Sequence, residues 1–194
     1  MRRRTFDALM VFAGLALTAI LVVAGGLLTW GHSFVNSEVR NQLVAQKIVF
    51  PAANSPAIKA PEFAAMRQYA GQTMTTGAQA EVYADHFIAN HLTEIGGGLT
   101  YSQLSAKSLA APKNAALAAQ VQTVFRGTTL RAMLLNAYGF GEMGVIAGIA
   151  AIVAFVGAAL LLTLSFLGLW HLRRVPEKQE VLAKVARSVS VQTA

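Results

Sequence analysis

The sequence predicts an all-α membrane protein in which two transmembrane helices enclose a small helical extracytoplasmic domain. Composition is the first observation: 55% of the 194 residues are hydrophobic and only 13% are charged, whereas a soluble domain is about one quarter charged. The second is a pair of charge-free runs long enough to cross a bilayer. The third is the segment between these runs, which shows helical periodicity and no useful length of strand-like alternation.

The two spans are predicted at residues 8–30 and 143–170, after a short N-terminal segment at residues 1–7. Neither run contains a charged residue, and even the shorter one exceeds the roughly 30 Å hydrocarbon core at about 1.5 Å per residue. Trp30 and Trp170 close the two runs, at the positions where indole rings favour the membrane–water boundary. The greater length of the second run is compatible with a tilted helix.

A cleaved signal peptide is the alternative to a retained first span. Three arginines at residues 2–4 precede the apolar run, and Val22-Val23-Ala24 resembles a cleavage site. The apolar run continues past this site to Trp30, which is longer than the core of most signal peptides. We therefore expect the first span to be retained as an anchor.

Charge distribution predicts the orientation. The two ends, residues 1–7 and the basic tail at residues 171–194, hold eight Lys or Arg against three acids, so they carry five of the seven net positive charges. Positive residues that flank spans remain on the cytoplasmic side, where they face anionic lipid. Both termini are thus predicted to be cytoplasmic in the cell membrane and residues 31–142 extracytoplasmic, and nucleic acid is not an expected partner.

The first half of the external domain is expected to contain a helix, a proline-rich segment and a second, short helix. The helix spans residues 33–49 and continues the first span outward, with Val35, Val39, Leu43 and Ile48 near one face. Prolines at positions 51, 56 and 61 predict an extended stretch, because each restricts its own backbone and the residue before it. The short helix follows at residues 62–69.

Two capping boxes and a glycine run predict the rest of the domain. Thr76 with Gln79 begins the clearest helix, which Gly96-Gly97-Gly98 ends. Thr100 with Gln103 begins a short helix that ends before Pro112. A last helix at residues 113–138 leads into the second span through Gly139, Gly141 and Gly144, where we expect a bend.

The richest polar segment, residues 81–94, holds two histidines and three carboxylates and invites interpretation as a metal site. On a regular helix, however, His86 and His91 lie about 140° apart, whereas ligand pairs are spaced by three or four residues. His91 falls within the apolar stripe, which indicates a hydrogen-bonded interior or interface histidine. Glu81 and Asp85 are expected on a solvated face. We predict no metal site here.

Other chemical motifs are also missing from the sequence. Without cysteine, disulfides, thiolate metal sites and covalently attached haem are excluded. His32 and His171 end their spans on opposite membrane faces, so they cannot share one haem iron. No ionisable side chain stands inside either span, and no phosphate loop, dinucleotide fingerprint or nucleophile elbow occurs. We expect no catalytic residues, no cofactor and no small-molecule substrate.

Small residues in the spans predict close helix packing, which substitutes for the missing hydrophobic drive in lipid. The small-residue stripe of the second span comprises Gly144, Ala147, Gly148, Ala151, Ala154 and Ala158. The first span offers Gly14, Thr18 and Gly25. The two spans may pack on each other through these residues or dock on the helices of a partner, and the sequence leaves both open. In the external domain, the candidate interface residues are Phe63, Tyr69, Phe87, His91 and Tyr101.

Four motifs resemble a group of actinobacterial two-span membrane proteins. They are Val39-x3-Leu43-x2-Gln46-x-Ile48-x-Phe50-Pro51, Gly77-x-Gln79-Ala80-x2-Tyr83-Ala84-Asp85-x2-Ile88-x2-His91-Leu92, Gly98-x-Thr100-Tyr101 and Phe125-Arg126-Gly127-x2-Leu130-Arg131. Some members carry an aromatic ring-opening dioxygenase label, but the two histidines and carboxylate that such an iron site needs are not evident here. The chain is also similar to the association factors of the actinobacterial cytochrome bcc–aa3 respiratory supercomplex.

This resemblance implies a non-catalytic accessory subunit that binds larger membrane subunits of the respiratory complex III and IV type within the lipid bilayer. The alternative is a self-contained homo-oligomeric envelope protein whose helical domain binds a small molecule or lipid. The tail after Arg174 contains no recognisable signalling module, which weighs against a sensor.

Overall fold

The computed structural model describes residues 3–174, with side chains from residue 5 onward. These residues form helices and connecting loops, and no β-strand occurs among them. A single antiparallel bridge joins Val49 to Thr73. The expected all-helical fold is therefore confirmed for the described part of the chain. Most of the predicted basic tail, residues 175–194, lies outside it.

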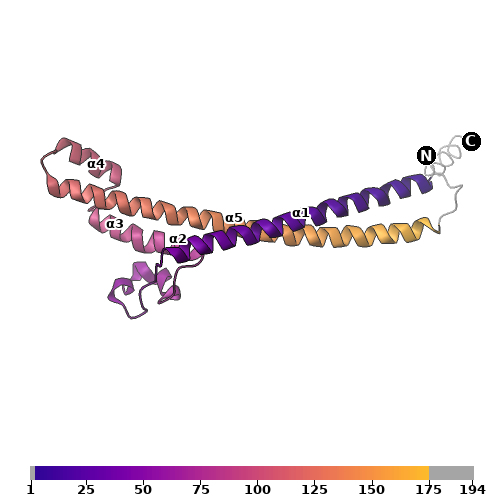
Figure 1. Cartoon of the computed structure of the whole chain (residues 1–194), viewed down its shortest axis with the longest axis horizontal. Helices are drawn as coiled ribbons and strands as arrows, with labels where there is room; N and C mark the ends of the chain where they lie inside the picture. Colours follow the sequence, from indigo (N-terminus) through magenta and orange to yellow (C-terminus); the bar gives the residue numbers. More distant parts are fainter. Residues whose placement is uncertain (1–2, 175–194) are drawn as a thin grey trace, which may run out of the picture. The chain divides into compact units, whose positions relative to one another are not determined.

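Two helices dominate the fold, α1 (Arg3–Ala45) and α5 (Ala115–Leu172) (Figure 1). Both are long and apolar enough to cross a membrane, and only 17% of the most apolar window of each is buried. A core helix of a soluble protein would instead be mostly buried. The predicted spans at residues 8–30 and 143–170 lie inside these helices, which extend well beyond them.

The contacts divide the chain into two compact units. Of the described residues, 3–30 and 147–174 form one unit, here called the spanning unit, and 31–146 form the other, here called the helical unit. Helices α1 and α5 contribute to both. The glycines at positions 139, 141 and 144, where the sequence predicted a bend, do not end α5, which is helical from end to end.

Helix α1 ends earlier than the predicted residue 49. Its last residue is Ala45, and the N–H groups of Gln46 and Lys47 bond back to the carbonyls of Leu43 and Val44 in a closing turn. Lys47 has a φ of +53°, the left-handed conformation that commonly ends a helix. Ile48 consequently lies outside the helix, where its carbonyl accepts a hydrogen bond from the N–H of Met74.

The prolines behave differently from the extended stretch that the sequence predicted. Pro56 and Pro61 each begin a 3₁₀-helix, η1 (Pro56–Ile58) and η2 (Pro61–Tyr69). The fixed φ of proline suits the first position of a helix, where its missing N–H needs no partner. The preceding residues, Ser55 and Ala60, are extended, with ψ near 134° and 154°.

The helix predicted after Thr76 forms, but it is composite. It consists of α2 (Gly77–Val82), the π-helical segment η3 (Tyr83–Ile88) and α3 (Ala89–Ile95). The capping box is complete: the Thr76 hydroxyl accepts from the Gln79 N–H at 3.2 Å, and the Gln79 side-chain oxygen accepts from the Thr76 N–H at 3.1 Å. After α3 ends, Gly97 and Gly98 adopt positive φ, as predicted for the glycine run.

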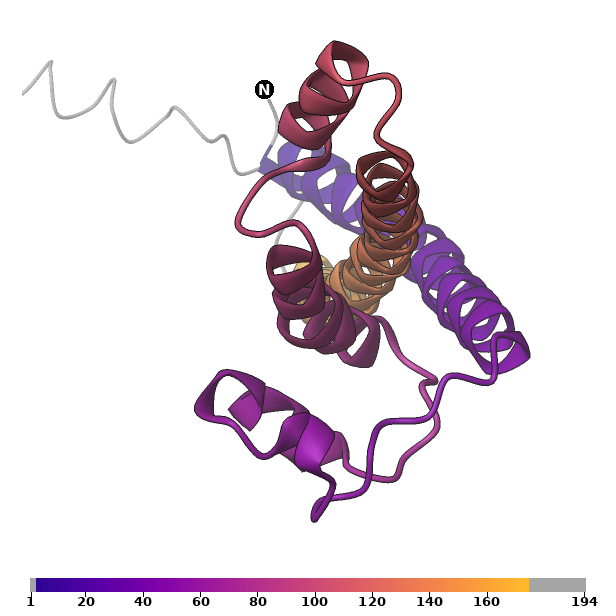
Figure 2. The ribbon, with the colours of Figure 1, turned by 90° about the vertical axis from the view of Figure 1, so that its left-hand side faces the viewer.

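The second capping box, Thr100 with Gln103, is also complete and begins α4 (Tyr101–Ala110). Helix α5 then starts at Ala115, where the Asn114 side chain accepts a hydrogen bond from the N–H of Leu117. Leu104 of α4 packs against Val121 and Val124 of α5 in a small apolar cluster. Figure 2 shows α4 beside the first turns of α5.

The main core of the helical unit lies where α1, η1, η2, α2, η3 and α5 meet. Its largest fully buried side chains are Phe50, Ile58, Met66 and Met74, each at most 1% exposed. Val39 and Leu43 of α1 and Leu134 of α5 complete it. Burial on this scale stabilises the unit by about 1.5–3 kcal/mol for each large apolar side chain.

Candidate helix-packing interface and docking surface

The spanning unit is held together by small side chains. Ala151, Ala154 and Ala158 of α5 are 4%, 8% and 4% exposed, and Thr18 of α1 is 7% exposed. The Thr18 hydroxyl donates to the carbonyl of Gly14, one turn earlier, at 2.8 Å, so no polar group is left unbonded at this position. These residues lie between two helices of the same chain.

The glycines in α1 mark the closest approaches. A Cβ at Gly14 would lie 2.5 Å from Ser165 Oγ, and one at Gly25 would lie 2.9 Å from the ring of Phe155. Both positions are tight, because a side chain at either one would force Ser165 or Phe155 to move. Gly168 of α5 meets Val11 in the same way, at 2.6 Å.

The N-terminal end of the small-residue stripe, at Gly144, also lies against α1. Gly144 is buried, and a Cβ there would be 2.9 Å from the side-chain oxygen of Asn36. Ala147 and Gly148 are half-buried. At this end of the stripe, Gly144 faces the chain's own first helix.

A hydrogen bond that the sequence did not suggest lies beside Gly144. The Nδ1 atom of His32 is 2.7 Å from the Gly144 carbonyl oxygen, so Nδ1 carries the proton and donates. The bond joins α1, just after the first predicted span, to α5 at the start of the second predicted span.

The outward faces of the two long helices carry large apolar side chains. On α1 and α5 many are more than half exposed; they include Leu9, Phe12, Ile20, Val23, Leu27, Ile149, Ile152, Val153 and Leu160. In water such faces would be costly. They suit a hydrocarbon environment or contact with another apolar helix.

Three of the candidate external interface residues pack against the main core. Phe63 is 7% exposed, and Tyr69 and Phe87 are half-buried against the main core. They face one another and the core because η2 lies across η3: the Phe63 and Phe87 ring centroids are 6.3 Å apart, and Tyr69 packs on Phe50 at 5.4 Å.

His91 belongs to this aromatic cluster. Its ring centroid lies 4.4 Å from that of Phe87 and 5.9 Å from that of Phe63, and its Nδ1 donates to the Phe87 carbonyl at 2.7 Å. It is thus a hydrogen-bonded interior histidine, as the sequence predicted. His86 bonds elsewhere, to the carbonyl of Glu62 at 3.2 Å. Among residues 3–174, no three His, Asp or Glu side chains converge as a metal site would require.

The acidic face of η3 is less solvated than predicted. Asp85 forms an ion pair with Arg131 of α5 at 2.6 Å, with both side chains 39% exposed. Glu81 lies near Tyr138, and its charge, together with that of Glu142, raises the pKa of the Tyr138 phenol above its ordinary value. Since a negative neighbour disfavours phenolate, Tyr138 stays protonated at neutral pH.

Tyr101 is the predicted interface residue that does remain exposed. It is 39% exposed and stacks on Phe125 of α5, itself 47% exposed, with ring centroids 5.4 Å apart. Leu109 lies about two turns further along α4 and is 80% exposed. We call these three residues the α4 surface. Leu109 and Phe125 were not among the interface candidates from the sequence, although Phe125 stands in one of the four motifs.

No protein-family model, curated protein or solved structure matches the chain significantly.

Proposed function

We propose that this chain is a non-catalytic accessory subunit that anchors in a membrane through α1 and α5 and binds larger membrane subunits. The α4 surface carries the proposal. It belongs to the helical unit, outside the predicted spans, where lipid does not cover apolar groups. Tyr101, Leu109 and Phe125 together expose aromatic and aliphatic area of the kind enriched at protein interfaces.

The packing of the spanning unit fits such a role. The small-residue stripe joins the two helices to each other, so the remaining large apolar side chains face outward and are available to lipid or to partner helices. The motif resemblance suggests the partner: subunits of the cytochrome bcc–aa3 oxidase supercomplex of actinobacteria. We place the helical unit on the extracytoplasmic side, following the charge distribution of the sequence.

The direct test is recovery of the tagged full-length chain from native membranes in a gentle detergent. The eluate is analysed by mass spectrometry and by a reduced-minus-oxidised visible spectrum. We expect haem absorption together with stoichiometric membrane subunits, because the proposed cytochrome partners carry haem. A colourless eluate that contains this chain alone would contradict the proposal.

A matched pair of variants assigns the contact. Leu109→Asp places a charge in the α4 surface, and since Leu109 is 80% exposed, the fold itself should tolerate it. We expect at least a several-fold loss of recovered partner. Lys107→Asp changes an exposed residue on another face of the same helix and should leave recovery unchanged. Equal recovery with both variants would remove the α4 surface from the proposal.

A further inference from the structure

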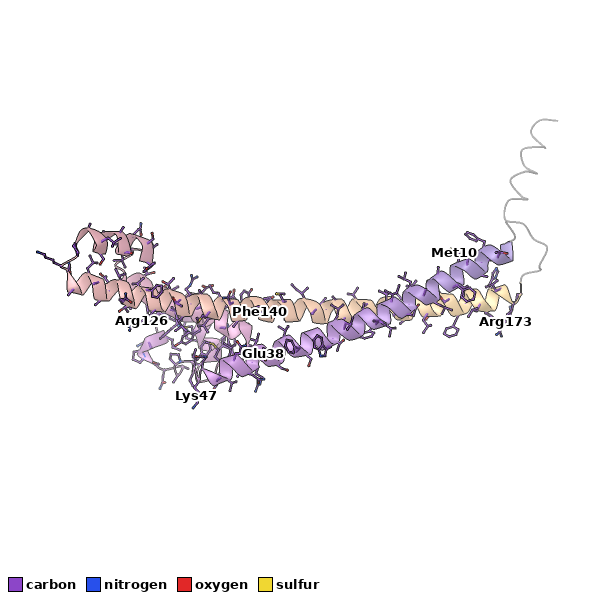
Figure 3. The ribbon with its side chains drawn as sticks, turned by 45° about the horizontal axis from the view of Figure 1, so that its top comes forward. Met10, Glu38, Lys47, Arg126, Phe140 and Arg173 are labelled. Atoms are coloured by element: carbon purple, nitrogen blue, oxygen red, sulfur yellow. The ribbon has the colours of Figure 1, made fainter. Side chains whose placement is uncertain are left out.

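The helical unit contains an elongated cavity of about 490 Å³ between α1 and α5. Its lining runs from Phe34 of α1 to Ile48 just after that helix, and on α5 from Leu130 to Phe140. We call it the α1–α5 groove; the labels of Glu38 and Phe140 in Figure 3 mark its two helices. Its volume lies within the range of about 300–1,000 Å³ that is typical of small-molecule sites.

The base of the groove is apolar and firmly packed. Val39, Leu43 and Leu134 are 9%, 3% and 3% exposed and belong to the main core. The apolar edges are uncovered: Met133 is 63% exposed and Phe140 is 58% exposed. The groove thus has a preformed apolar floor, and the apolar side chains of Met133 and Phe140 at its edges remain exposed.

One edge of the groove is polar but carries no positive charge. Glu38, Gln42 and Gln46 recur every four residues along α1, and the Gln42 amide donates to the Glu38 carboxylate at 2.8 Å. Asn136 adds an amide from α5. No Lys, Arg or His is among the lining residues. A phosphate group would meet only a carboxylate here, whereas a hydroxyl or ester could bond to the amides.

The length of the groove suits an extended hydrocarbon chain. From Phe34 to Ala45, the last residue of α1, the groove follows the helix for about 16 Å. Together with the apolar floor, this gives an elongated apolar site in which an acyl chain can lie along the two helices.

The position along the chain supports the same occupant. Phe34 follows Trp30, the end of the first predicted span, by one helical turn, and Phe140 precedes the second predicted span by three residues. Both lie on helices that continue into those spans without interruption. The mouth of the groove is thus one turn from the segment that contacts lipid.

We propose that the α1–α5 groove binds one hydrocarbon chain of a neutral membrane lipid whose uncharged polar head bonds to the amide edge. This site does not depend on the proposed function, since it is formed by the chain alone. A lipid held here would cover Met133 and Phe140 and would brace α1 against α5 just outside the bilayer.

The test uses the purified full-length chain in phosphatidylcholine nanodiscs. The discs contain a diacylglycerol with a diazirine in its acyl chain, and in a parallel sample a phosphatidylglycerol with the same photoactivatable chain. After irradiation, mass spectrometry locates the adducts. We expect diacylglycerol adducts on residues 34–46 and 130–140, and several-fold fewer from phosphatidylglycerol at these positions. Labelling of residues 8–30 and 143–170 by both lipids serves as the internal standard.

Two variants and one control sharpen the test. Met133→Trp fills the groove from an exposed position and should lower groove labelling about tenfold, because several buried methylenes lose their contacts. Ala132→Trp adds the same ring at the neighbouring exposed position, outside the lining, and should change nothing. Glu38→Lys should raise labelling by phosphatidylglycerol.

Either of two results would overturn the proposal. One is unchanged groove labelling in Met133→Trp, with the variant's helical circular dichroism intact. The other is equal labelling of the groove by the neutral and the anionic lipid in the unmodified chain. Because no partner subunit is present in the discs, the outcome is independent of whether the chain also serves as an accessory subunit.

Discussion

Lys47 ends α1 in a conformation that costs free energy. Its φ of +53° lies in the left-handed region, where the Cβ of an L-residue approaches the following carbonyl at a cost of about 1–2 kcal/mol. Glycine is the usual residue at such a position. The surrounding structure holds Lys47 there because Ile48 and Phe50 must turn toward the strand-like segment at Met74 and Gln72.

Replacement of this lysine should therefore stabilise the fold. We expect Lys47→Gly to raise the free energy of unfolding by about 0.5–1 kcal/mol, the relief of left-handed strain less the extra entropy of glycine. Thermal unfolding in detergent, followed by circular dichroism, measures the change. Lys47→Ala is the control and should have almost no effect, since it keeps the Cβ. A lower melting temperature for Lys47→Gly would show that the strain is absent.

Single residues also decide how much of the local structure could be predicted. Thr76 and Thr100 begin their helices as expected, because a capping box is a short-range device whose partners stand three residues apart. The end of α1 could not be placed, since the turn at Lys47 depends on the distant bonds to Gln72 and Met74. Local sequence patterns thus determine where α2 and α4 begin, whereas tertiary contacts determine where α1 ends.

At the scale of elements, the π-helical segment η3 changes which residues face the core. The N–H of Ala89 bonds to the carbonyl of Ala84, five residues back, so residues after it are displaced from the positions that a regular helix of about 100° per residue would give them. The hydrophobic periodicity of the sequence cannot reveal this change from α-helical to π-helical geometry. Asp85 lies within η3 and pairs with Arg131, while both side chains remain 39% exposed.

Helices α2 and α5 meet backbone to backbone. A Cβ at Gly77 would lie 3.0 Å from the Ala137 carbonyl oxygen and 3.3 Å from the Cα of Gly141. Backbone cannot move aside as a flexible side chain can. Gly139, two residues before Gly141, has nothing within 4 Å of its Cβ position. The glycines that suggested a bend thus have distinct roles, and Gly141 and Gly144 permit close contacts.

This contrast supplies a matched pair of substitutions. Gly77→Ala should destabilise the helical unit by about 1–3 kcal/mol, as overpacking does. Gly139→Ala should stabilise α5 by about 0.5–1 kcal/mol, because alanine is the better helix former and meets no obstacle. Melting temperatures in the same detergent should therefore move in opposite directions. Parallel shifts would contradict the contact between α2 and α5.

The small-residue stripe is a poor place to test binding of a partner. The sequence left its docking role open, and in the structure Gly144 faces Asn36 at a distance that leaves no space for a side chain. A Gly144→Leu and Gly148→Leu double variant would disturb the pairing of the chain's own helices. Lost co-purification after that change would report the fold of this chain, which makes the exposed Leu109 the better position for a partner test.

For the whole molecule, the sequence predicts the class of fold more fully than the surfaces. Two charge-free runs and the capping motifs suffice to predict two long apolar helices and a helical segment between them, because these depend on composition and local order. Phe63 and Tyr101 were both interface candidates from the sequence, but Phe63 is 7% exposed and Tyr101 is 39% exposed. The packing of η2 across η3 decides this, and it rests on contacts between residues far apart in sequence.

The central claim is that α1 and α5 cross the membrane and leave the helical unit outside, with the described C-terminal end inside. Since the chain has no cysteine, single cysteines can report topology without a background. Leu109→Cys and Arg173→Cys both replace exposed side chains, one on α4 and one just after α5.

The most direct measurement is the labelling of these two variants in right-side-out membrane vesicles with a membrane-impermeant maleimide. The account predicts that Leu109→Cys is labelled in intact vesicles and that Arg173→Cys is labelled only after lysis. Labelling of Arg173→Cys in intact vesicles, or protection of Leu109→Cys until lysis, would contradict the proposed topology and with it the position of the α4 surface.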